Sequence, residues 1–296
     1  MRRPQNDVPV RSLKVGRLQR EYRVVAPADL PKEPMPVVFV FHGGTMTNGS
    51  LNMLRDSGFA ELARKEGFVA VFPQGVDGHW NDKRDSAFFQ SLTERGVDDV
   101  AFARAITEQL IRQYPIDLSR VYAVGVSNGG IFCHRLAHEA SNLIVAIAPI
   151  IASMPDNLAP QFAPKHPVSA IIFQGDADPL IPYNGGFVGV IGGRRGKVIP
   201  AEETVQKYLR LNGITAKPEV ITLPDKDPSD GTTTEAHRYP PGREGHRVEY
   251  YRVRGGGHCW FGRKPGNARV GKSSFDFRAT DEAWRFFKQV PARRRS

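Results

Sequence analysis

Short apolar runs alternate along the chain with segments in which apolar residues recur every three or four positions. The runs are rich in Val, Ile, Phe and Tyr and have the length of buried strands. Strands are predicted at residues 20–26, 36–42, 68–73, 120–126, 144–151, 168–174 and 247–254. Helices are predicted between them at residues 51–66, 97–114, 128–140, 201–212 and 279–289. This alternation predicts an α/β fold with a mostly parallel central sheet and helices on both faces.

The chain of 296 residues, 40% of them hydrophobic, is long enough to bury one large core. Residues 224–245 are polar and carry turn signals such as Asp230-Gly231, which predict a loop and hairpin rather than a domain linker. We therefore expect one domain over residues 1–296, without a large lid domain. Residues 1–18 are predicted to be an N-terminal extension, and residues 290–296 a flexible basic tail.

The net charge of +10 raises the question of an anionic partner. The basic residues are scattered, however, and the clusters at Arg194-Arg195 and Arg293-Arg294-Arg295 are not interleaved with aromatic residues that could stack on bases. We expect neither nucleic-acid binding nor a membrane span, because the apolar runs are too short to cross a bilayer. Residues 1–7 lack the apolar stretch of a secretory signal, so either the protein stays inside the cell or a signal is missing from this chain.

The pentapeptide Gly125-Val126-Ser127-Asn128-Gly129 lies between a predicted strand and a predicted helix. In such a strand-turn-helix unit the serine occupies a strained turn that projects its hydroxyl above the sheet, and the flanking glycines leave room for the backbone. The alternative is a Gly-rich turn with an ordinary serine. The strand-to-helix context favours a nucleophile at Ser127.

A serine hydroxyl needs an adjacent base, and that base needs an orienting carboxylate. Downstream of Ser127, a loop after the strand at 168–174 carries Asp176 and Asp178, of which Asp178 lies further out. The glycines of Gly255-Gly256-Gly257-His258 follow the last predicted strand and allow His258 to reach across the sheet edge. The order serine, acid, histidine favours Ser127, Asp178 and His258, with Asp176 shaping the turn.

The segment His42-Gly43-Gly44-Thr45 follows the strand at 36–42. Small residues expose backbone amides there, and we expect the amide of Gly44 or Thr45, with that of Asn128, to face a developing oxyanion. A plain Gly-rich turn is the alternative.

Aromatic residues also occur on loops at this predicted edge, namely Trp80, Tyr183, Trp260 and Phe261. We expect Trp80, Tyr183 and Trp260 to contact substrate, although core packing would explain each aromatic equally well.

Together these segments resemble the esterase family that groups bacterial polyhydroxybutyrate depolymerases with feruloyl and acetyl-xylan esterases. The resemblance spans most of the chain and rests on residues 41–44, 97–100, 114–117, 125–130, 175–178, 181–186 and 255–260. It implies an α/β-hydrolase fold and the same triad of Ser127, Asp178 and His258. Many relatives have Cys where Gly44 stands and Thr-Trp-Pro where this chain has Cys259-Trp260-Phe261, so the rim of the cleft is expected to differ.

Two weaker patterns are rejected as ligand sites. The stretch that begins at Asp225 lacks the glycine and the glutamate of a calcium loop, and residues 192–197 lack the first glycine and the Ser or Thr of a phosphate loop. We therefore expect no metal and no cofactor. Two cysteines are too few for a disulfide framework, but a bond between Cys133 and Cys259 is conceivable because both adjoin candidate catalytic segments.

These patterns predict a serine ester hydrolase that acts through an acyl-enzyme on a small-molecule or polymeric ester, as a monomer or a small homo-oligomer. The alternatives are a serine peptidase or amidase on the same fold, and a non-catalytic binding protein on a hydrolase scaffold. The sequence does not choose between hydroxybutyrate, ferulate, acetate and a synthetic polyester unit as the acyl group.

Overall fold

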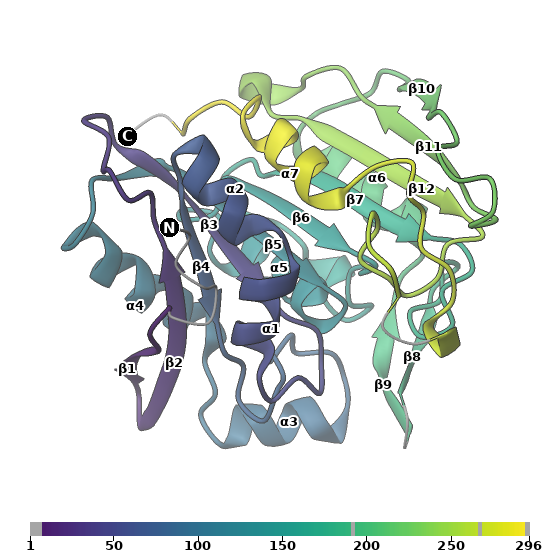
Figure 1. Ribbon diagram of the computed structural model, residues 1–296. Helices are drawn as coiled ribbons and strands as arrows, with labels where there is room; N and C mark the ends of the chain where they lie inside the picture. Colours follow the sequence, from purple (N-terminus) through teal and green to yellow (C-terminus); the bar gives the residue numbers. More distant parts are fainter. Residues whose placement is uncertain (1–7, 191–192, 266–267, 294–296) are drawn as a thin grey trace.

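A computed structural model describes residues 8–190, 193–265 and 268–293. One large sheet crosses this part of the chain (Figure 1). Its strands, in spatial order, are β1 (Arg11–Val15), β2 (Leu18–Val25), β4 (Val69–Pro73), β3 (Met35–Phe41), β5 (Ile116–Val126), β6 (Ala146–Ile150), β7 (Ser169–Gly175), β12 (Val248–Arg254), β11 (Thr233–Arg238) and β10 (Glu219–Thr222). In this spatial order the six strands from β4 to β12 run parallel to one another. On either side the outer strands pair antiparallel, namely β1 and β2 at one edge and β11 and β10 at the other.

Helices cover both faces of this sheet, as the alternation of strands and helices predicted (Figure 1). They are α1 (Gly49–Asp56), α2 (Phe59–Glu66), α4 (Asp99–Ile111), α5 (Asn128–Glu139), α6 (Ala201–Leu211) and α7 (Ala279–Phe287). The helix α3 (Ala87–Glu94) lies beyond the end of the sheet, and short 3-10 turns occur at Ala159–Gln161, Arg243–Gly245 and Ala268–Val270. Within the described ranges, none of the helices has the length and apolar character that a membrane span requires.

Strand β3 shows how the two layers are held, because all of its residues are buried. Val37, Phe39 and Phe41 belong to one buried cluster together with residues of α4, α5 and α6, whereas Val38 and Val40 belong to another together with residues of α1, α2 and α7. Alternate side chains of a strand point to opposite faces, so a continuous apolar run is what a strand between two helical layers needs. The predicted α/β fold with a mostly parallel sheet is confirmed.

Some of the predicted boundaries are wrong. The helix predicted at 51–66 is two helices, because Gly58 adopts a left-handed backbone (φ 81°) between them. The predicted N-terminal extension contains β1, whose residues pair with β2. The loop and hairpin predicted at 224–245 are present, since the loop leads into β11, which pairs antiparallel with β10 and with β12. A hairpin of β8 (Gly186–Val190) and β9 (Gly193–Val198) and the helix α3 were not predicted.

The tail predicted at residues 290–296 is in part attached to the protein, because Val290 and Arg293 make contacts with it. Val290 is buried, and Arg293 is anchored through its backbone N–H to Ser119 O at 3.0 Å. The Arg293 guanidinium also donates to Asn142 O at 2.6 Å and to Ile144 O at 2.8 Å. Residues 294–296, including Arg294 and Arg295 of the predicted basic tail, lie outside the described residues.

His134 is a core residue that joins three elements. It lies fully buried on α5, its Nε2 donates to Ala152 O at 3.1 Å just after β6, and its Nδ1 accepts from the Tyr208 hydroxyl of α6 at 2.9 Å. Burial lowers the pKa of His134 to about 4. The imidazole is therefore neutral in the folded protein at pH values where the unfolded chain still binds a proton.

We predict that the free energy of unfolding falls as the pH is lowered from about 6.5 to about 4. In that window the unfolded chain protonates His134 and the folded protein does not, so acid favours unfolding. Urea titrations at pH 4 and pH 6.5 should show a smaller difference for His134→Gln than for the unsubstituted protein. An identical pH dependence for the two proteins would contradict this assignment.

Candidate active site

The backbone at Ser127 has the strained geometry of an exposed nucleophile. Ser127 lies between β5 and α5 with φ 54° and ψ −123°, a conformation that costs a residue with a side chain on the order of 1–3 kcal/mol. Its N–H donates to Ile150 O at the end of β6, and its C=O accepts from Ile131 N in the first turn of α5. These bonds hold the turn in place at the carboxyl edge of the sheet.

The two flanking glycines are required by close backbone contacts. A Cβ on Gly125 would lie 2.3 Å from Gly129 O, and a Cβ on Gly129 would lie 2.4 Å from His42 O. Real Cβ atoms do not approach so closely, so only glycine fits at either position. The spacing of the pentapeptide thus has a steric cause, and it brings the turn against the end of β3.

Asp178 and His258 meet at the same edge of the sheet. The distance from His258 Nδ1 to Asp178 Oδ2 is 2.7 Å. The Asp178 carboxylate is completely buried, and its other oxygen accepts from Leu180 N at 2.7 Å and Ile181 N at 2.9 Å. Because the carboxylate accepts the Nδ1 proton, the lone pair of the imidazole lies on Nε2.

Asp176 performs a different task on the same loop. Its Oδ1 accepts from Gly255 N at 2.8 Å, and its Oδ2 accepts from the Arg252 guanidinium at 3.1 Å and 3.2 Å. A Cβ on Gly175 would lie 2.3 Å from Gly256 O, so the β7 loop and the glycine loop before His258 are in close contact. Asp176 therefore fixes the loop that carries the histidine.

Ser127 and His258 follow strands of one parallel sheet, with Ser127 after β5 and His258 after β12. Within the described ranges, the Ser127 hydroxyl makes no hydrogen bond to His258. Hydrogen bonds between a nucleophile and its base often tighten only when substrate binds. The structure thus joins the acid to the histidine directly and places the serine on the same sheet edge.

His42 orients the loop that faces the serine. Its Nε2 accepts from Gly75 N at 2.9 Å, which leaves the proton on Nδ1 for a 2.7 Å bond to Gly43 O. Burial lowers the pKa of His42 to about 4, so the ring stays neutral and keeps both bonds. In a trans peptide the C=O and N–H point in opposite directions, so fixing Gly43 O also fixes the direction of the Gly44 N–H.

Of the two alternatives Gly44 and Thr45, Thr45 does not offer a free amide. Its N–H donates to His79 Nε2 at 3.2 Å. Within the described ranges, the amide N–H groups of Gly44 and Asn128 have no protein acceptor. A Cβ on Gly44 would lie 3.5 Å from Asn128 Cβ, so the two residues are neighbours. Gly44 and Asn128 therefore remain the candidate oxyanion donors.

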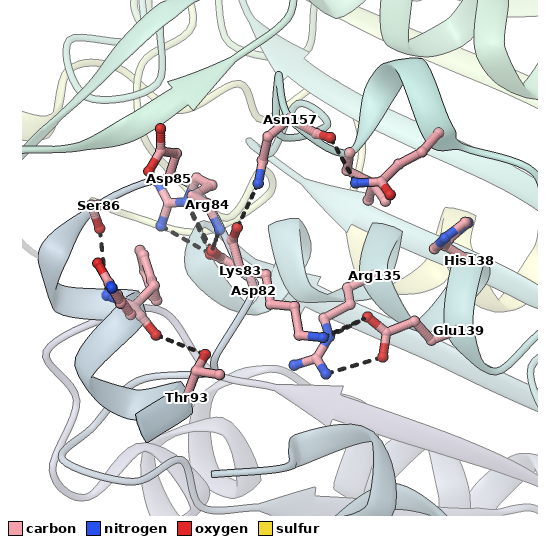
Figure 2. Close-up of a pocket in the computed structure, with 14 residues that line it drawn as sticks. Asp82, Lys83, Arg84, Asp85, Ser86, Thr93, Arg135, His138, Glu139 and Asn157 are labelled. Carbon is pink, nitrogen blue, oxygen red and sulfur yellow. Dashed lines mark hydrogen bonds and ion pairs between the residues drawn. The ribbon is translucent and has the colours of Figure 1, made fainter. Parts of the chain in front are cut away.

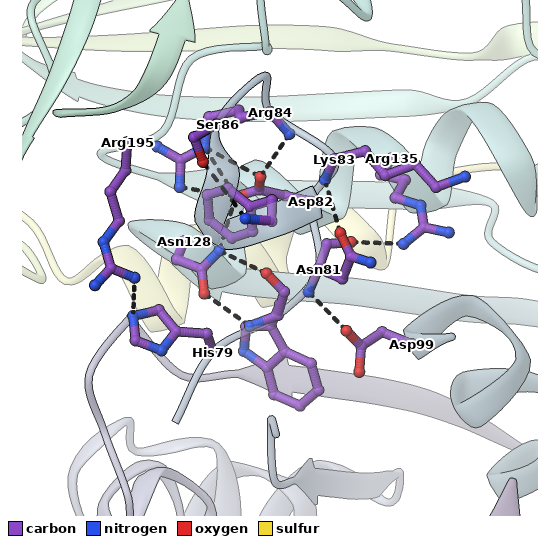
Figure 3. Close-up of polar contacts among 12 residues, drawn as sticks. His79, Asn81, Asp82, Lys83, Arg84, Ser86, Asp99, Asn128, Arg135 and Arg195 are labelled. Atoms are coloured by element: carbon purple, nitrogen blue, oxygen red, sulfur yellow. Dashed lines mark hydrogen bonds and ion pairs between the residues drawn. The ribbon is translucent and has the colours of Figure 1, made fainter. Parts of the chain in front are cut away.

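The side chain of Asn128 is bound by the loop after β4 (Figure 3). Its Oδ1 accepts from Trp80 N at 2.8 Å, and its Nδ2 donates to Trp80 O at 3.0 Å and to Asp82 Oδ2 at 2.7 Å. Asp82 in turn accepts from Arg84 Nε at 3.1 Å and 3.0 Å. Sequence reasoning missed Asp82 and Arg84, and their signal would have been the polar run His79 to Arg84 directly after a buried strand.

Trp80 and Phe261 are not exposed aromatics. Both are fully buried, and Trp80 stacks on Phe132 with 5.6 Å between ring centroids. The Trp80 indole N–H donates to His42 O at 2.9 Å. The predicted contact between Trp80 and substrate is therefore wrong, because this side chain supports the loop from inside the core.

Tyr183 and Trp260 are only partly buried. The Tyr183 hydroxyl accepts from Tyr250 at 2.8 Å and donates to Glu202 at 3.1 Å, while the Trp260 indole N–H donates to Thr280 Oγ1 at 3.1 Å. Their polar groups are thus engaged within the protein, and their partly exposed rings are what remains for contact with a ligand.

A cavity of about 650 Å³ lies between α3 and α5 (Figure 2). Lys83, Arg84, Arg135 and Glu139 are among the residues that line it, but none of Ser127, Asp178 and His258 does. Glu139 Oε1 forms ion pairs with Arg135 Nε at 2.8 Å and with Lys83 Nζ at 3.6 Å. The cavity therefore adjoins the candidate active site through the loop of Asp82 and does not contain it.

The disulfide that the sequence left open between the two cysteines is not formed. Cys133 and Cys259 are both free and buried, and Cys259 Sγ donates to Gly271 O at 3.6 Å.

No family model matches the chain. Among known proteins, NocK of Nocardia uniformis subsp. tsuyamanensis, which bears a provisional esterase name, is 30% identical over 272 residues, or 88% of this chain and 77% of NocK. The chain belongs to this esterase family. Feruloyl esterase B of Piromyces equi is 25% identical over 202 residues, or 68% of this chain, which spans only 35% of that relative.

Solved structures support the fold of this esterase. The acetyl xylan esterase from Aspergillus awamori superposes with a TM-score of 0.59 at 14% identity, over 91% of this chain and 94% of that one. At such identity the likeness concerns the fold alone. The fold and the relatives confirm the predicted resemblance to esterases with the α/β-hydrolase fold.

We predict that Asp82→Ala lowers the free energy of unfolding of this esterase by about 3–5 kcal/mol. The substitution leaves the buried Arg84 guanidinium without its carboxylate and removes an acceptor from Asn128. The matched control is Asp56→Ala, which breaks the exposed pair with Arg263 and should cost less than about 1 kcal/mol. Urea unfolding measures both, and equal losses in the two variants would contradict the role of Asp82.

Proposed function

We propose that this esterase hydrolyses carboxylic esters with Ser127 as nucleophile, His258 as general base and Asp178 as the orienting acid. The observation that carries the proposal is the 2.7 Å bond between His258 and the buried Asp178 carboxylate, on the sheet edge that also bears the strained Ser127. Serine, acid and histidine follow β5, β7 and β12, which is the chain order of α/β-hydrolase triads.

In the first step His258 Nε2 takes the proton of the Ser127 hydroxyl while the oxygen attacks the ester carbonyl. The tetrahedral intermediate collapses when the carbon–oxygen bond to the alcohol breaks, and His258 gives the proton to the departing alcohol. In the second step His258 takes a proton from water, whose oxygen attacks the acyl carbon. The bond from that carbon to Ser127 Oγ then breaks, His258 returns the proton to this oxygen, and the acid is released. Asp178 keeps the ring in the tautomer that both steps require.

The oxyanion is assigned to the amides of Gly44 and Asn128. Their N–H groups make no other hydrogen bond in the described part of the chain, and two networks hold them. His42 fixes the peptide before Gly44, and Trp80 and Asp82 bind the side chain of Asn128. Donors that are held before the reaction lose little free energy to reorganisation when charge develops.

The proposal also concerns the acyl group of the ester substrate. Relatives named for feruloyl and acetyl-xylan esters support an acyl group that ranges from acetyl to aryl-acryloyl. Tyr183 and Trp260 are the aromatic side chains at the rim that could contact such a group. Neither of the two steps requires a second protein or a nucleic acid.

We predict that Ser127→Ala and Asp178→Asn each lower kcat by about a thousandfold or more. Asp178→Asn leaves Nδ1 without its carboxylate and favours the wrong tautomer of His258. The matched control is Asp176→Asn on the same loop, which keeps the His258 partner and should lower kcat by less than about tenfold. Initial rates on a 4-nitrophenyl ester measure all three, and a larger loss in Asp176→Asn than in Asp178→Asn would reverse the assignment.

The peptidase alternative makes a different prediction. If the site acts on esters, the purified protein should hydrolyse 4-nitrophenyl acetate and methyl ferulate, while 4-nitroanilides of amino acids should remain intact under the same conditions. Cleavage of the anilides at rates equal to the esters would favour the peptidase.

A further inference from the structure

The β8–β9 hairpin packs against the helix α5, which begins directly after Ser127. Val188 and Val198 of the hairpin pack with Ile131, which lies in the first turn of α5 after Ser127. A Cβ on Gly196 would lie 2.7 Å from Arg84 Cβ, so β9 passes directly over Arg84. These contacts fix the position of Arg195, the residue before Gly196.

Arg195 contacts residues from two other segments. Its Nη1 donates to His79 Nε2 at 3.0 Å, and its guanidinium carbon lies 3.8 Å from the centroid of the Phe88 ring on α3. The His79 and Phe88 rings also touch, with 4.6 Å between their centroids. The guanidinium is thereby held in one orientation over Phe88, with only part of its hydrogen-bonding capacity used.

The charge of Arg195 has no counterpart. Among the residues that the structure describes, no carboxylate forms an ion pair with it. Burial and the neighbouring Arg84 cation both lower the pKa of Arg195, and no acid counteracts them. Other partly buried arginines here, such as Arg252 and Arg285, are paired with Asp176 and Glu249. Figure 3 shows that the terminal nitrogen of Arg195 not bonded to His79 points away from the labelled residues.

This free cation is close to the candidate oxyanion donors. A Cβ on Gly44 would lie 3.3 Å from His79 Nε2, and the same nitrogen is 3.0 Å from Arg195 Nη1. The guanidinium and Gly44 therefore both lie next to the same edge of the His79 ring. A substrate held at Gly44 and Asn128 would have the cation beside it.

We propose that Arg195 binds a carboxylate carried by the ester substrate, and that the site therefore prefers esters with an anionic group in the acyl or alcohol part. This inference rests on the proposed ester hydrolysis. A guanidinium fork matches the two oxygens of a carboxylate, and hydrogen bonds to a charged group discriminate strongly against a ligand that lacks it.

A different role for Arg195 is to clamp the oxyanion loop through His79, which also accepts the amide of Thr45. The two roles can be distinguished by which substrates are affected when Arg195 is replaced. A clamp acts on every ester, because it supports Gly44, whereas a binding site acts only on esters that bring a charge.

The test uses pairs of esters that differ only in charge. One pair is the 4-nitrophenyl monoester of adipic acid and its methyl ester, which place the charge on the acyl side. The other is 3-acetoxybenzoate and its methyl ester, which place it on the alcohol side. kcat/KM is measured for the unsubstituted protein, for Arg195→Gln, and for Lys197→Gln as the control. Lys197 is an exposed cation on the same strand that lies over Phe187 and does not contact His79.

We expect the unsubstituted protein to prefer the charged member of at least one pair, and Arg195→Gln to lower that preference by about tenfold to a hundredfold, mainly through KM. Lys197→Gln should keep the preference. Equal losses on charged and neutral esters in Arg195→Gln would establish the clamp and overturn the proposal, as would a preference that survives the substitution.

A binding measurement separates this inference from the proposed hydrolysis. Calorimetry with Ser127→Ala should show that the adipate monoester binds, and that adding Arg195→Gln weakens the binding by about tenfold or more. If neither ester of a pair is turned over but this difference in binding is found, the hydrolysis fails and the anion site stands. If esters are turned over but Arg195→Gln binds the monoester unchanged, the anion site fails and the hydrolysis stands.

Discussion

The candidate site depends on one close approach between backbones. The turn at Ser127 lies so near the end of β3 that a Cβ on Gly129 would be 2.4 Å from His42 O. The same carbonyl accepts the indole N–H of Trp80. This contact brings the nucleophile turn, the Gly43-Gly44 loop and the loop after β4 to a single point. The strained serine and its two candidate oxyanion donors follow from it.

Buried polar groups then hold that point in one arrangement. His42 is kept neutral by burial and spans from Gly75 N to Gly43 O. The loop after β4 is fixed on one side by Asn128 and on the other by Asp99 at the start of α4, whose Oδ2 accepts from Asn81 N at 2.7 Å. Asp99 is also paired with the buried Arg20 at 2.6 Å. Breaking a buried pair of this kind costs far more than breaking a surface pair, so these contacts strongly favour one arrangement of the loop.

The sequence predicted those parts whose cause is local. Continuous apolar runs identified the buried strands, and the glycine spacing around Ser127 and before His258 identified the turns that carry these residues. The sequence could not show that Trp80 turns inward, because an aromatic residue on a loop suits the core and the rim equally. Nor could it show that His79 takes the amide of Thr45, or that Arg195 lies beside His79. Such contacts depend on how segments far apart in the chain are packed.

The central claim is that Ser127, Gly44 and Asn128 converge on one reacting carbonyl. The most direct measurement is a crystal structure of the protein after reaction with a 4-nitrophenyl alkylphosphonate, whose adduct imitates the tetrahedral intermediate. The account predicts phosphorus bonded to Ser127 Oγ and a phosphoryl oxygen within hydrogen-bond distance of the amides of Gly44 and Asn128. An adduct at another residue, or a phosphoryl oxygen bound by neither amide, would contradict it.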